Sequence, residues 1–286
     1  MKIALLTYEE KPDLSPQEKP FIDIFRSKAV EAVTVVWSDK TVDWSSFDIV
    51  IPKACWDYYL FPQQFLSFLS LLDQKGIKLI NPLPSIVWNH KKSYLKDLQA
   101  KGVEIADFEI IRSVNQFEGI LQEKNWSDVI IKPMISGASY LTESYRSNDT
   151  DAAKTHLAKV LEHSEAIIQP LFPEIPSQGE ISMMFFGGKF SHAVLKTPLQ
   201  GDFRSQPQFG SKVMDYEPSE NVIREAHRTL TLAPSELAYA RVDGFLRDDR
   251  FLLMELELIE PFLFTDEEPG VKHQTFVESV LAFANR

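Results

Sequence analysis

Residues 252–261, with the sequence LLMELELIEP, constrain the fold and the chemistry of this chain more than any other stretch. Three carboxylates, Glu255, Glu257 and Glu260, interrupt an otherwise apolar run. Side chains alternate along a β-strand, so Glu255 and Glu257 would project from one face and the leucines between and after them from the other. We therefore expect a strand with one apolar and one acidic face.

Two interpretations of this acidic face are open. Carboxylates two residues apart on a strand lie ~6.6–6.8 Å from each other, and they repel by roughly 2–3 kcal/mol at an effective dielectric constant near 20. Water can offset that repulsion on an exposed strand. A buried strand needs a cation, and oxygen ligands favour a hard one such as Mg²⁺. The decapeptide alone is consistent with a solvated amphipathic strand and with a metal site.

Length and charge set the class of protein. The 286 residues suit two or three small subdomains around a common site. With 44% apolar and 25% charged residues, the composition is that of a folded chain. The net charge of −11 argues against nonspecific binding to nucleic acid or to an anionic membrane. A local basic pocket that binds a phosphorylated ligand is compatible with this net charge.

Cysteine content and hydropathy limit the kinds of site and the cellular location that we expect. The single cysteine, Cys55, excludes an internal disulfide and a cysteine-based zinc site, and it is more typical of a small core residue than of a nucleophile. The first apolar run has four residues, too few for the core of a signal peptide. No apolar run approaches the ~18–20 residues of a membrane span. We expect a cytoplasmic, enzyme-like protein, and the sequence leaves open whether it forms a homodimer.

The amino-terminal part alternates strands with helices, which predicts a small parallel α/β unit that ends near residue 83. The expected strands are 2–7, 34–37, 47–52 and 77–80, and the expected helices are 20–31 and 62–76. Pro62 and Gly76 mark the ends of the second helix.

The rest of the chain has the pattern of two α+β units. Helices are expected at 86–101, 115–124, 149–162, 218–230 and 271–285. Strands are expected at 108–112, 128–133, 165–171, 180–186, 189–197, 239–246 and 250–258. There is no repeat, low-complexity segment or flexible linker, so we predict that the units pack together. The expected subdomains are 1–84, 85–170 and 171–286.

Several basic residues could meet an anion, although the glycine-rich, Walker and HExxH signatures are absent. Lys132 ends an apolar strand and precedes a segment of small residues, 136–139, that could fold over phosphate oxygens. Lys196, Arg204 and Lys212 fall in what looks like a basic loop, where Arg204 would suit phosphate best. Each of these sets could equally lie in solvent.

Two further residues, Lys92 and Asp243, must be interpreted together with the segments around them. Lys92 lies in a lysine-rich segment that, by itself, looks like the solvated face of a helix. Asp243 lies on the strand before the acidic strand. If these two strands pair, Asp243 could join Glu255 and Glu257 in a Mg²⁺ site.

The order of these features resembles the ATP-grasp superfamily, in particular the branch of glutathione-synthetase-type and glutamate-adding ligases. The motifs IIQPL, GEISMMFFGGKFSHAVLK, DFRSQ, RVDGF and MELELIEP follow the two lysines in the same sequence as in that superfamily. The resemblance covers roughly 85–265, and the WDYY, NP and WN segments extend it toward the amino terminus. It implies an ATP-grasp fold, with a small parallel α/β subdomain followed by two α+β subdomains that grip ATP.

The resemblance also implies a role for each matching position. The nucleotide would be held by two lysines, the loop over the phosphates, the interdomain hinge and an acid at the ribose: Lys92, Lys132, Ser136, Gly137, Ser139, Gln169, Pro170, Leu171, and Glu174 or Glu180. Lys196 and Arg204 would face the γ-phosphate and the acyl intermediate. Asp243, Glu255 and Glu257 would bind magnesium.

The chain departs from the family pattern in two places that matter for the site. The last metal ligand is often asparagine, and Glu257 stands here instead, which should favour two bound Mg²⁺ ions. The phosphate loop has one glycine where relatives often have more, so its closure should be stiffer. Neither departure removes a charged group that the chemistry requires.

The resemblance implies an ATP-dependent ligase that activates a small-molecule carboxylate as an acyl phosphate for attack by an amine. The alternatives are an ATP-grasp small-molecule kinase and a nucleotide-binding protein without turnover. A sugar-cleaving pair formed by Glu255 and Glu257 fits only the spacing of the two acids. The segment after the third strand would recognise the substrate through Lys53, Trp56, Asp57, Tyr58 and Tyr59. Glu260 would turn the chain or meet substrate.

Overall fold

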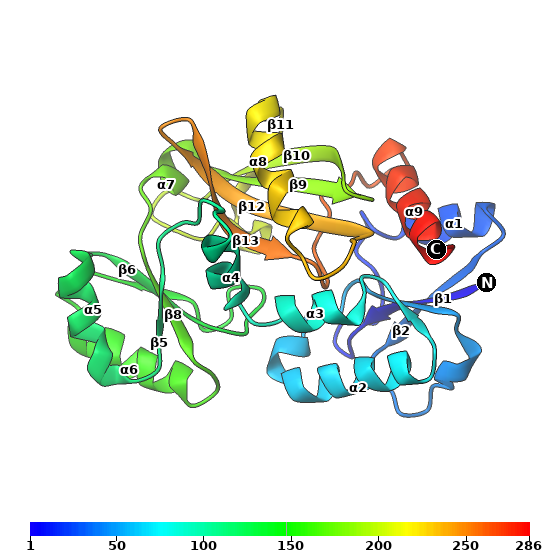
Figure 1. The fold of residues 1–286 in the computed structure, drawn as a ribbon, viewed down its shortest axis with the longest axis horizontal. Coiled ribbons are helices and arrows are strands. Elements are labelled where there is room, and N and C mark those ends of the chain that lie inside the picture. Colours follow the sequence, from blue (N-terminus) through cyan, green and yellow to red (C-terminus); the bar gives the residue numbers. More distant parts are fainter. Residues whose placement is uncertain (147) are drawn as a thin grey trace.

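Three β-sheets organise the protein, as a computed structural model that describes residues 1–146 and 148–286 shows (Figure 1). The first sheet is parallel throughout and has the strand order β2-β1-β3-β4. Its strands are β1 (Lys2–Thr7), β2 (Glu31–Val36), β3 (Ile49–Pro52) and β4 (Lys78–Leu79). The expected parallel α/β unit at the amino terminus is thereby confirmed.

Helices from both ends of the chain pack on this unit. They are α1 (Pro20–Ser27), α2 (Pro62–Gln74) and α9 (Val271–Ala284). In α2, the spacing of Phe65, Leu69 and Leu72 buries one face. The rings of Phe21 in α1 and Phe276 in α9 lie with centroids 4.4 Å apart. Figure 1 shows α9, in red, beside α1, so the end of the chain returns to its beginning.

The second sheet is antiparallel and has the order β5-β8-β6-β7. Its strands are β5 (Glu109–Ile111), β6 (Val129–Pro133), β7 (Glu143–Tyr145) and β8 (Ala166–Pro170). The helices α5 (Phe117–Lys124) and α6 (Thr150–Leu161) bury apolar side chains such as Phe117 and Leu157 against it. The opposite face is left to line the site described below.

The third sheet carries the acidic strand at its edge. Its order is β11-β10-β9-β12-β13, with all pairs antiparallel. The strands are β9 (Glu180–Phe186), β10 (Lys189–Thr197), β11 (Lys212–Tyr216), β12 (Tyr239–Arg247) and β13 (Arg250–Glu257). The helices α4 (Tyr94–Ala100) and α8 (Glu220–Thr231) pack on the apolar face of this sheet. The remaining short helices are α3 (Leu83–Asn89) and α7 (Glu174–Gln178).

Side chains from one short segment satisfy the outer edge of β13. Asn89 donates from Nδ2 to the Leu256 carbonyl at 2.7 Å and accepts from the Leu258 N–H at 3.0 Å. The Leu256 N–H donates to the Tyr94 hydroxyl at 2.8 Å, and Asn81 Nδ2 donates to the Leu258 carbonyl at 2.9 Å. Because buried backbone groups need partners, these bonds fix the register of the strand that carries Glu255 and Glu257.

The expected single helix over 86–101 is wrong. The chain forms α3 and α4 instead, with Lys92 in the turn between them. The Lys92 N–H donates to the Met134 carbonyl at 3.0 Å, a long-range bond that a continuous helix could not make. Tertiary contact therefore overrides the helical pattern at this point.

Two smaller expectations also need correction. The first helix ends at Ser27 rather than near 31, because Ala29 adopts a φ of 58° and strand β2 starts at Glu31. Lys196 is not on a loop, since it lies within β10, and Lys212 begins the edge strand β11. The subdomain boundaries at 84 and 170 stay a prediction. Within the described residues, no helix has the length and apolar content needed to cross a membrane.

Candidate active site

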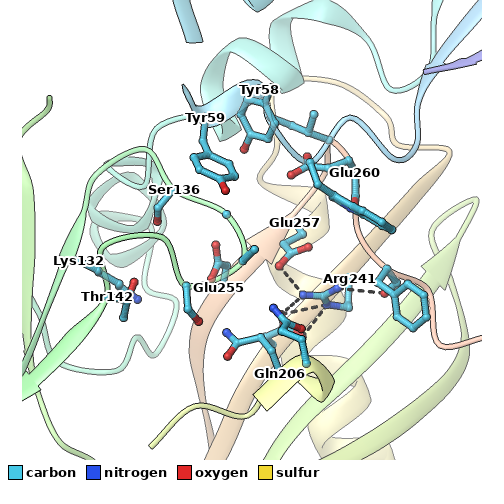
Figure 2. A pocket seen from close by; sticks show the side chains of 18 of the residues that line it. Tyr58, Tyr59, Lys132, Ser136, Thr142, Gln206, Arg241, Glu255, Glu257 and Glu260 are labelled. Carbon is cyan, nitrogen blue, oxygen red and sulfur yellow. Dashed lines mark hydrogen bonds and ion pairs between the residues drawn. The ribbon is translucent and has the colours of Figure 1, made fainter. Parts of the chain in front are cut away.

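A cavity of about 960 Å³ is lined by residues of the second and third sheets and by loops of all three units, among them the loops that follow β1 and β3. Figure 2 shows its centre, where Glu255, Glu257 and Arg241 project from the third sheet. Lys132, Ser136 and Thr142 face them from the second sheet and its loop, and Tyr58, Tyr59 and Glu260 from the side of the first unit. The cavity thus gathers most of the residues singled out from the sequence.

Glu255 and Lys92 form the first ion pair of the site. Lys92 Nζ lies 2.6 Å from Glu255 Oε1 and donates to the Ser136 carbonyl at 3.1 Å. Lys92 is buried, so the solvated helix face that its segment suggests is wrong. Burial opposes ionisation of Glu255, but Lys92 and Lys132 outweigh it and lower the pKa of this carboxyl.

Asp243 lies directly opposite Glu255 across the β12–β13 ladder, as expected if these strands pair. Its carboxylate accepts three bonds of 2.9–3.1 Å from the Arg241 guanidinium and a short one from the Ser182 hydroxyl. Burial raises the pKa of Asp243, and Arg241 and Lys196 more than reverse that effect. The side chain is buried, charged and fully bonded.

Arg241 is a functional candidate that the sequence reasoning missed. It lines the cavity and also pairs with Glu257, so one guanidinium holds two carboxylates. Burial, together with Asp243 and Glu255, raises the pKa of Glu257 to about 7 against the opposing effect of Arg241. The signal was present in the sequence, because an arginine within the apolar strand segment YARVDGF requires a buried anion.

The cations Lys132, Lys196 and Arg204 all line the cavity. Lys196 is buried and donates from Nζ to Glu180 at 2.8 Å, with Asp243 3.9 Å away. Burial lowers the pKa of Lys132, which has no ion pair among the residues described. Lys132 is therefore a buried cation of the cavity wall that could meet an anionic ligand. Arg204 forms a fork with Asp202 and lies over the Phe209 ring, 3.8 Å from its centroid.

The expected phosphate loop lies between β6 and β7, and Ser136, Gly137 and Ser139 line the cavity. Gln169, on β8, lines it as well, whereas Pro170 and Leu171 do not. Of the two acids considered for the ribose, Glu180 faces the cavity. Glu174 lies outside the lining and is paired with Arg247.

Of the residues expected to recognise the substrate, four line the cavity and one does not. Trp56, Asp57, Tyr58 and Tyr59 line the cavity. Lys53 does not, because it is fully buried in an ion pair with Glu18 and donates to the Pro261 carbonyl at 2.9 Å. Cys55 is also buried, and burial raises the pKa of its thiol, in agreement with a core residue.

Glu260 belongs to the same wall of the cavity as Trp56. Its carbonyl accepts from Trp56 Nε1 at 3.0 Å, and its carboxylate lines the cavity without an ion pair among the described residues. Burial, reinforced by Glu257, raises the pKa of Glu260 well above its usual value. The expectation that Glu260 turns the chain or meets substrate stays a prediction.

Glu255, Glu257 and Asp243 are not equally suited to bind a hard cation. Glu255 and Glu257 present oxygen donors to the cavity, with side chains 29% and 28% exposed, which suits Mg²⁺. Asp243 could bind a metal only if Arg241 released it. Apart from residue 147, which is not described, no group of three or more histidine, cysteine, aspartate and glutamate side chains is arranged to hold a metal ion. The three-carboxylate set stays a prediction.

Comparisons with known proteins identify the fold. Residues 3–81 match the family model of the amino-terminal domain of D-cycloserine synthetase DcsG. The cycloserine biosynthesis protein DcsG of Streptomyces lavendulae is 26% identical over 285 residues, which is 94% of each chain. The crystal structure of D-cycloserine synthetase DcsG superposes with a TM-score of 0.87 at 23% identity, covering 99% of this chain and 100% of that one.

A third match carries the superfamily name. The ATP-grasp ligase PsnB, in complex with a minimal precursor, Mg and ADP, superposes with a TM-score of 0.66 at 14% identity, covering 99% of this chain and 98% of that one. The protein has the ATP-grasp fold. The order of motifs also resembles that of the ligase that closes the cycloserine ring, and the chain is similar to DcsG over almost its whole length.

Proposed function

We propose that this ATP-grasp protein is an ATP-dependent ligase that activates a small-molecule carboxylate as an acyl phosphate and couples it to an amine. The observation that carries the proposal is the pairing of opposite walls in one cavity. One wall holds the lysines, arginines and acids of the second and third sheets, and the other holds aromatic and acidic side chains of the first unit. Phosphates and the small substrate could therefore meet end to end.

The reaction would proceed in two displacements. A carboxylate oxygen of the substrate attacks the γ-phosphorus of ATP, and ADP leaves. The nitrogen of the amine then attacks the acyl carbon, phosphate leaves, and the nitrogen loses a proton. The product is an amide, or a ring if acid and amine belong to one molecule, as the likeness to DcsG favours.

The residues of the chain would act mainly by position and charge. Lys132 and Lys92 would contact the phosphates, under a loop that begins at Ser136. Lys196 and Arg204 would face the γ-phosphate as its charge is redistributed. Gln169, on β8, and Glu180, on β9, would contact the base and the ribose. Holding both substrates in one geometry supplies much of the rate.

Glu255 and Glu257 would hold Mg²⁺, with Asp243 joining them if Arg241 moves. When bound, Mg²⁺ would offset the negative charge of the phosphates. Two ions, the number favoured by Glu257 in place of asparagine, remain part of the proposal. A cytoplasmic location, where ATP is made, and a homodimer also stay proposals.

Replacing Glu255 tests the assignment. Glu255→Gln removes the charge of one metal ligand and keeps the size of the side chain, so we expect ADP release to fall below detection while the thermal unfolding temperature changes little. The measurement is a coupled ADP assay over a panel of amino acids and small carboxylates, with and without an amine. Gln122→Glu, at an exposed helix position, is the matched control and should turn over like the parent protein. Turnover in Glu255→Gln at the parent rate would refute the assignment.

A further inference from the structure

The loop between β6 and β7 rests on the wall that faces the substrate. A Cβ atom placed on Gly137 would lie 2.9 Å from Cδ1 and 3.2 Å from Cε1 of Tyr59. Tyr59 follows the third strand of the first unit, almost eighty positions earlier in the sequence. The aromatic ring therefore packs directly on the loop backbone at the one glycine of the loop.

A second contact extends this packing. The rings of Tyr59 and Tyr140 lie with centroids 5.2 Å apart. In the same loop, next to Gly137 and Tyr140, Ala138, Ser139 and Leu141 adopt φ values of 50°, 59° and 46°. Residues other than glycine avoid this left-handed region, and they persist there only when surrounding contacts hold them.

The loop has two anchors of different kinds. At its start, the Ser136 carbonyl accepts from Lys92 Nζ, which is also paired with Glu255. Farther along, the Tyr59 ring covers Gly137 and Tyr140. The first anchor belongs to the acidic strand and the second to the substrate wall. Figure 2 shows Tyr59 next to Ser136, with its hydroxyl end directed toward the side of the cavity where Glu255 lies.

We propose that Tyr59 is a positioning residue, whose ring holds residues 136–142 over the nucleotide and so couples nucleotide binding to the substrate wall. The inference rests on the proposed function, which assigns this loop to the phosphates. A ring that fills the space above Gly137 explains why this position has no side chain. It also explains how a loop with a single glycine keeps three other residues at positive φ.

A double-mutant cycle tests the coupling. Gly137→Ala should clash with the Tyr59 ring and weaken binding of Mg²⁺ with a non-hydrolysable ATP analogue roughly tenfold, since contacting residues couple in such cycles. Tyr59→Ala should weaken it to a similar degree by releasing the loop. In the Tyr59→Ala background, Gly137→Ala should cost nothing more. Calorimetry gives the dissociation constants, and thermal unfolding shows which variants are folded.

Tyr59→Phe is the matched control, because it removes the hydroxyl and keeps the ring. Gly137→Ala should cost the same roughly tenfold in the Tyr59→Phe background as in the parent protein. An equal cost of Gly137→Ala in all three backgrounds would overturn the proposal, since the glycine would then act without Tyr59. So would the absence of any cost in the parent background.

A second measurement does not depend on ligase activity or on nucleotide. Chymotrypsin can cut after Tyr140, and the packed ring should protect this bond. Without ligand, Tyr59→Ala should be cut there at least several times faster than the parent protein, and Tyr59→Phe at the parent rate. Equal rates in all three would overturn the proposal. If the parent protein binds no nucleotide, the proposed function fails, and the cutting rates alone decide the role of Tyr59.

Discussion

Arg241 shows how one residue can organise several others. Its guanidinium contacts Asp243 and Glu257 and donates to the Phe262 carbonyl at 3.0 Å. Burial opposes its charge, but the two acids raise the pKa of Arg241 further, so the residue is a permanent cation. Without this guanidinium, Glu257 would lose its ion pair, and Asp243 would keep only Lys196 as a cationic neighbour.

Arg241→Lys keeps the charge and loses the fork, so both carboxylates should lose their fixed orientation. We expect kcat for ADP release to fall roughly 100-fold, in the range seen when one positioned donor is removed. Affinity for ATP should change much less, because the lysines that would contact the phosphates remain. Steady-state kinetics and calorimetry together measure the two effects. A parallel loss in both would contradict a role that is confined to the reacting end.

His192 is a residue whose effect is on stability. It lies on β10, where Nε2 and the Leu263 carbonyl are 2.8 Å apart, and burial lowers the pKa of its ring to about 4. An unfolded chain would protonate this histidine near pH 6.5. Between pH 6.5 and 4 the unfolded state therefore binds more protons than the folded state, and the free energy of unfolding falls as the pH falls.

For His192 this loss should reach about 3 kcal/mol at pH 4. His192→Gln keeps a side-chain donor and cannot take up a proton. The variant should lose less stability than the parent protein over the same window, as urea unfolding at a series of pH values would show. Identical pH profiles would mean that the ring is not held neutral.

At the scale of single residues, sequence reasoning identified the charged residues of the site better than the residues that pair with them. It placed Glu255 and Glu257 on one face because strand periodicity is a local property, and Asp243 joined them only if its strand paired with theirs. Local patterns alone could not place Lys92 or Lys53, because each is buried by a partner far along the chain, Glu255 in one case and Glu18 in the other. Sequence reasoning named Glu174 for a role that its pairing with Arg247 makes unsuitable in this structure.

At the scale of elements, β13 depends on its outer edge. Edge strands expose backbone groups, and here Asn89, Asn81 and Tyr94 satisfy those of Leu256 and Leu258. The element is thereby both a sheet edge and a buried strand. The acidic face can then point into the cavity while the other side chains pack in the core.

Asn89→Ala should leave the Leu256 carbonyl and the Leu258 N–H without partners, at a cost of about 1–3 kcal/mol for each group. The Mg²⁺ concentration for half-maximal ADP release should also rise, because Glu255 and Glu257 flank the loosened residues. Asn221→Ala, on the exposed face of α8, is the control and should change stability by less than about 0.5 kcal/mol. Unchanged stability and Mg²⁺ dependence in Asn89→Ala would contradict this account of the edge.

Elements with strong periodicity were predicted and those set by distant contacts were not. The spacing of apolar residues identified α2, and Pro62 marked its start. The break between α3 and α4 left no local signal, because it follows from the bond between Lys92 and the loop after β6. The edge strand β11 and short helix α7 also lack a pattern long enough to read.

At the scale of the whole molecule, one cavity gathers residues of the second and third sheets and of the loops that follow β1 and β3 in the first unit. The order of charged motifs predicted that assembly through a family resemblance, and the comparisons support the fold. The return of α9 to the first unit was not predicted, since its apolar face could pack on any sheet. By joining the two ends of the chain, α9 ties the substrate wall to the segment that follows β13.

The central claim is that a carboxylate attacks the γ-phosphate, and isotope transfer tests it most directly. An acid found in the ADP screen would be labelled with ¹⁸O in its carboxyl group and turned over with ATP and the amine. We expect one ¹⁸O atom to appear in each inorganic phosphate released, as mass spectrometry of the phosphate would show. Phosphate without label, or a stable phosphorylated product and no amide, would contradict acyl phosphate formation followed by coupling.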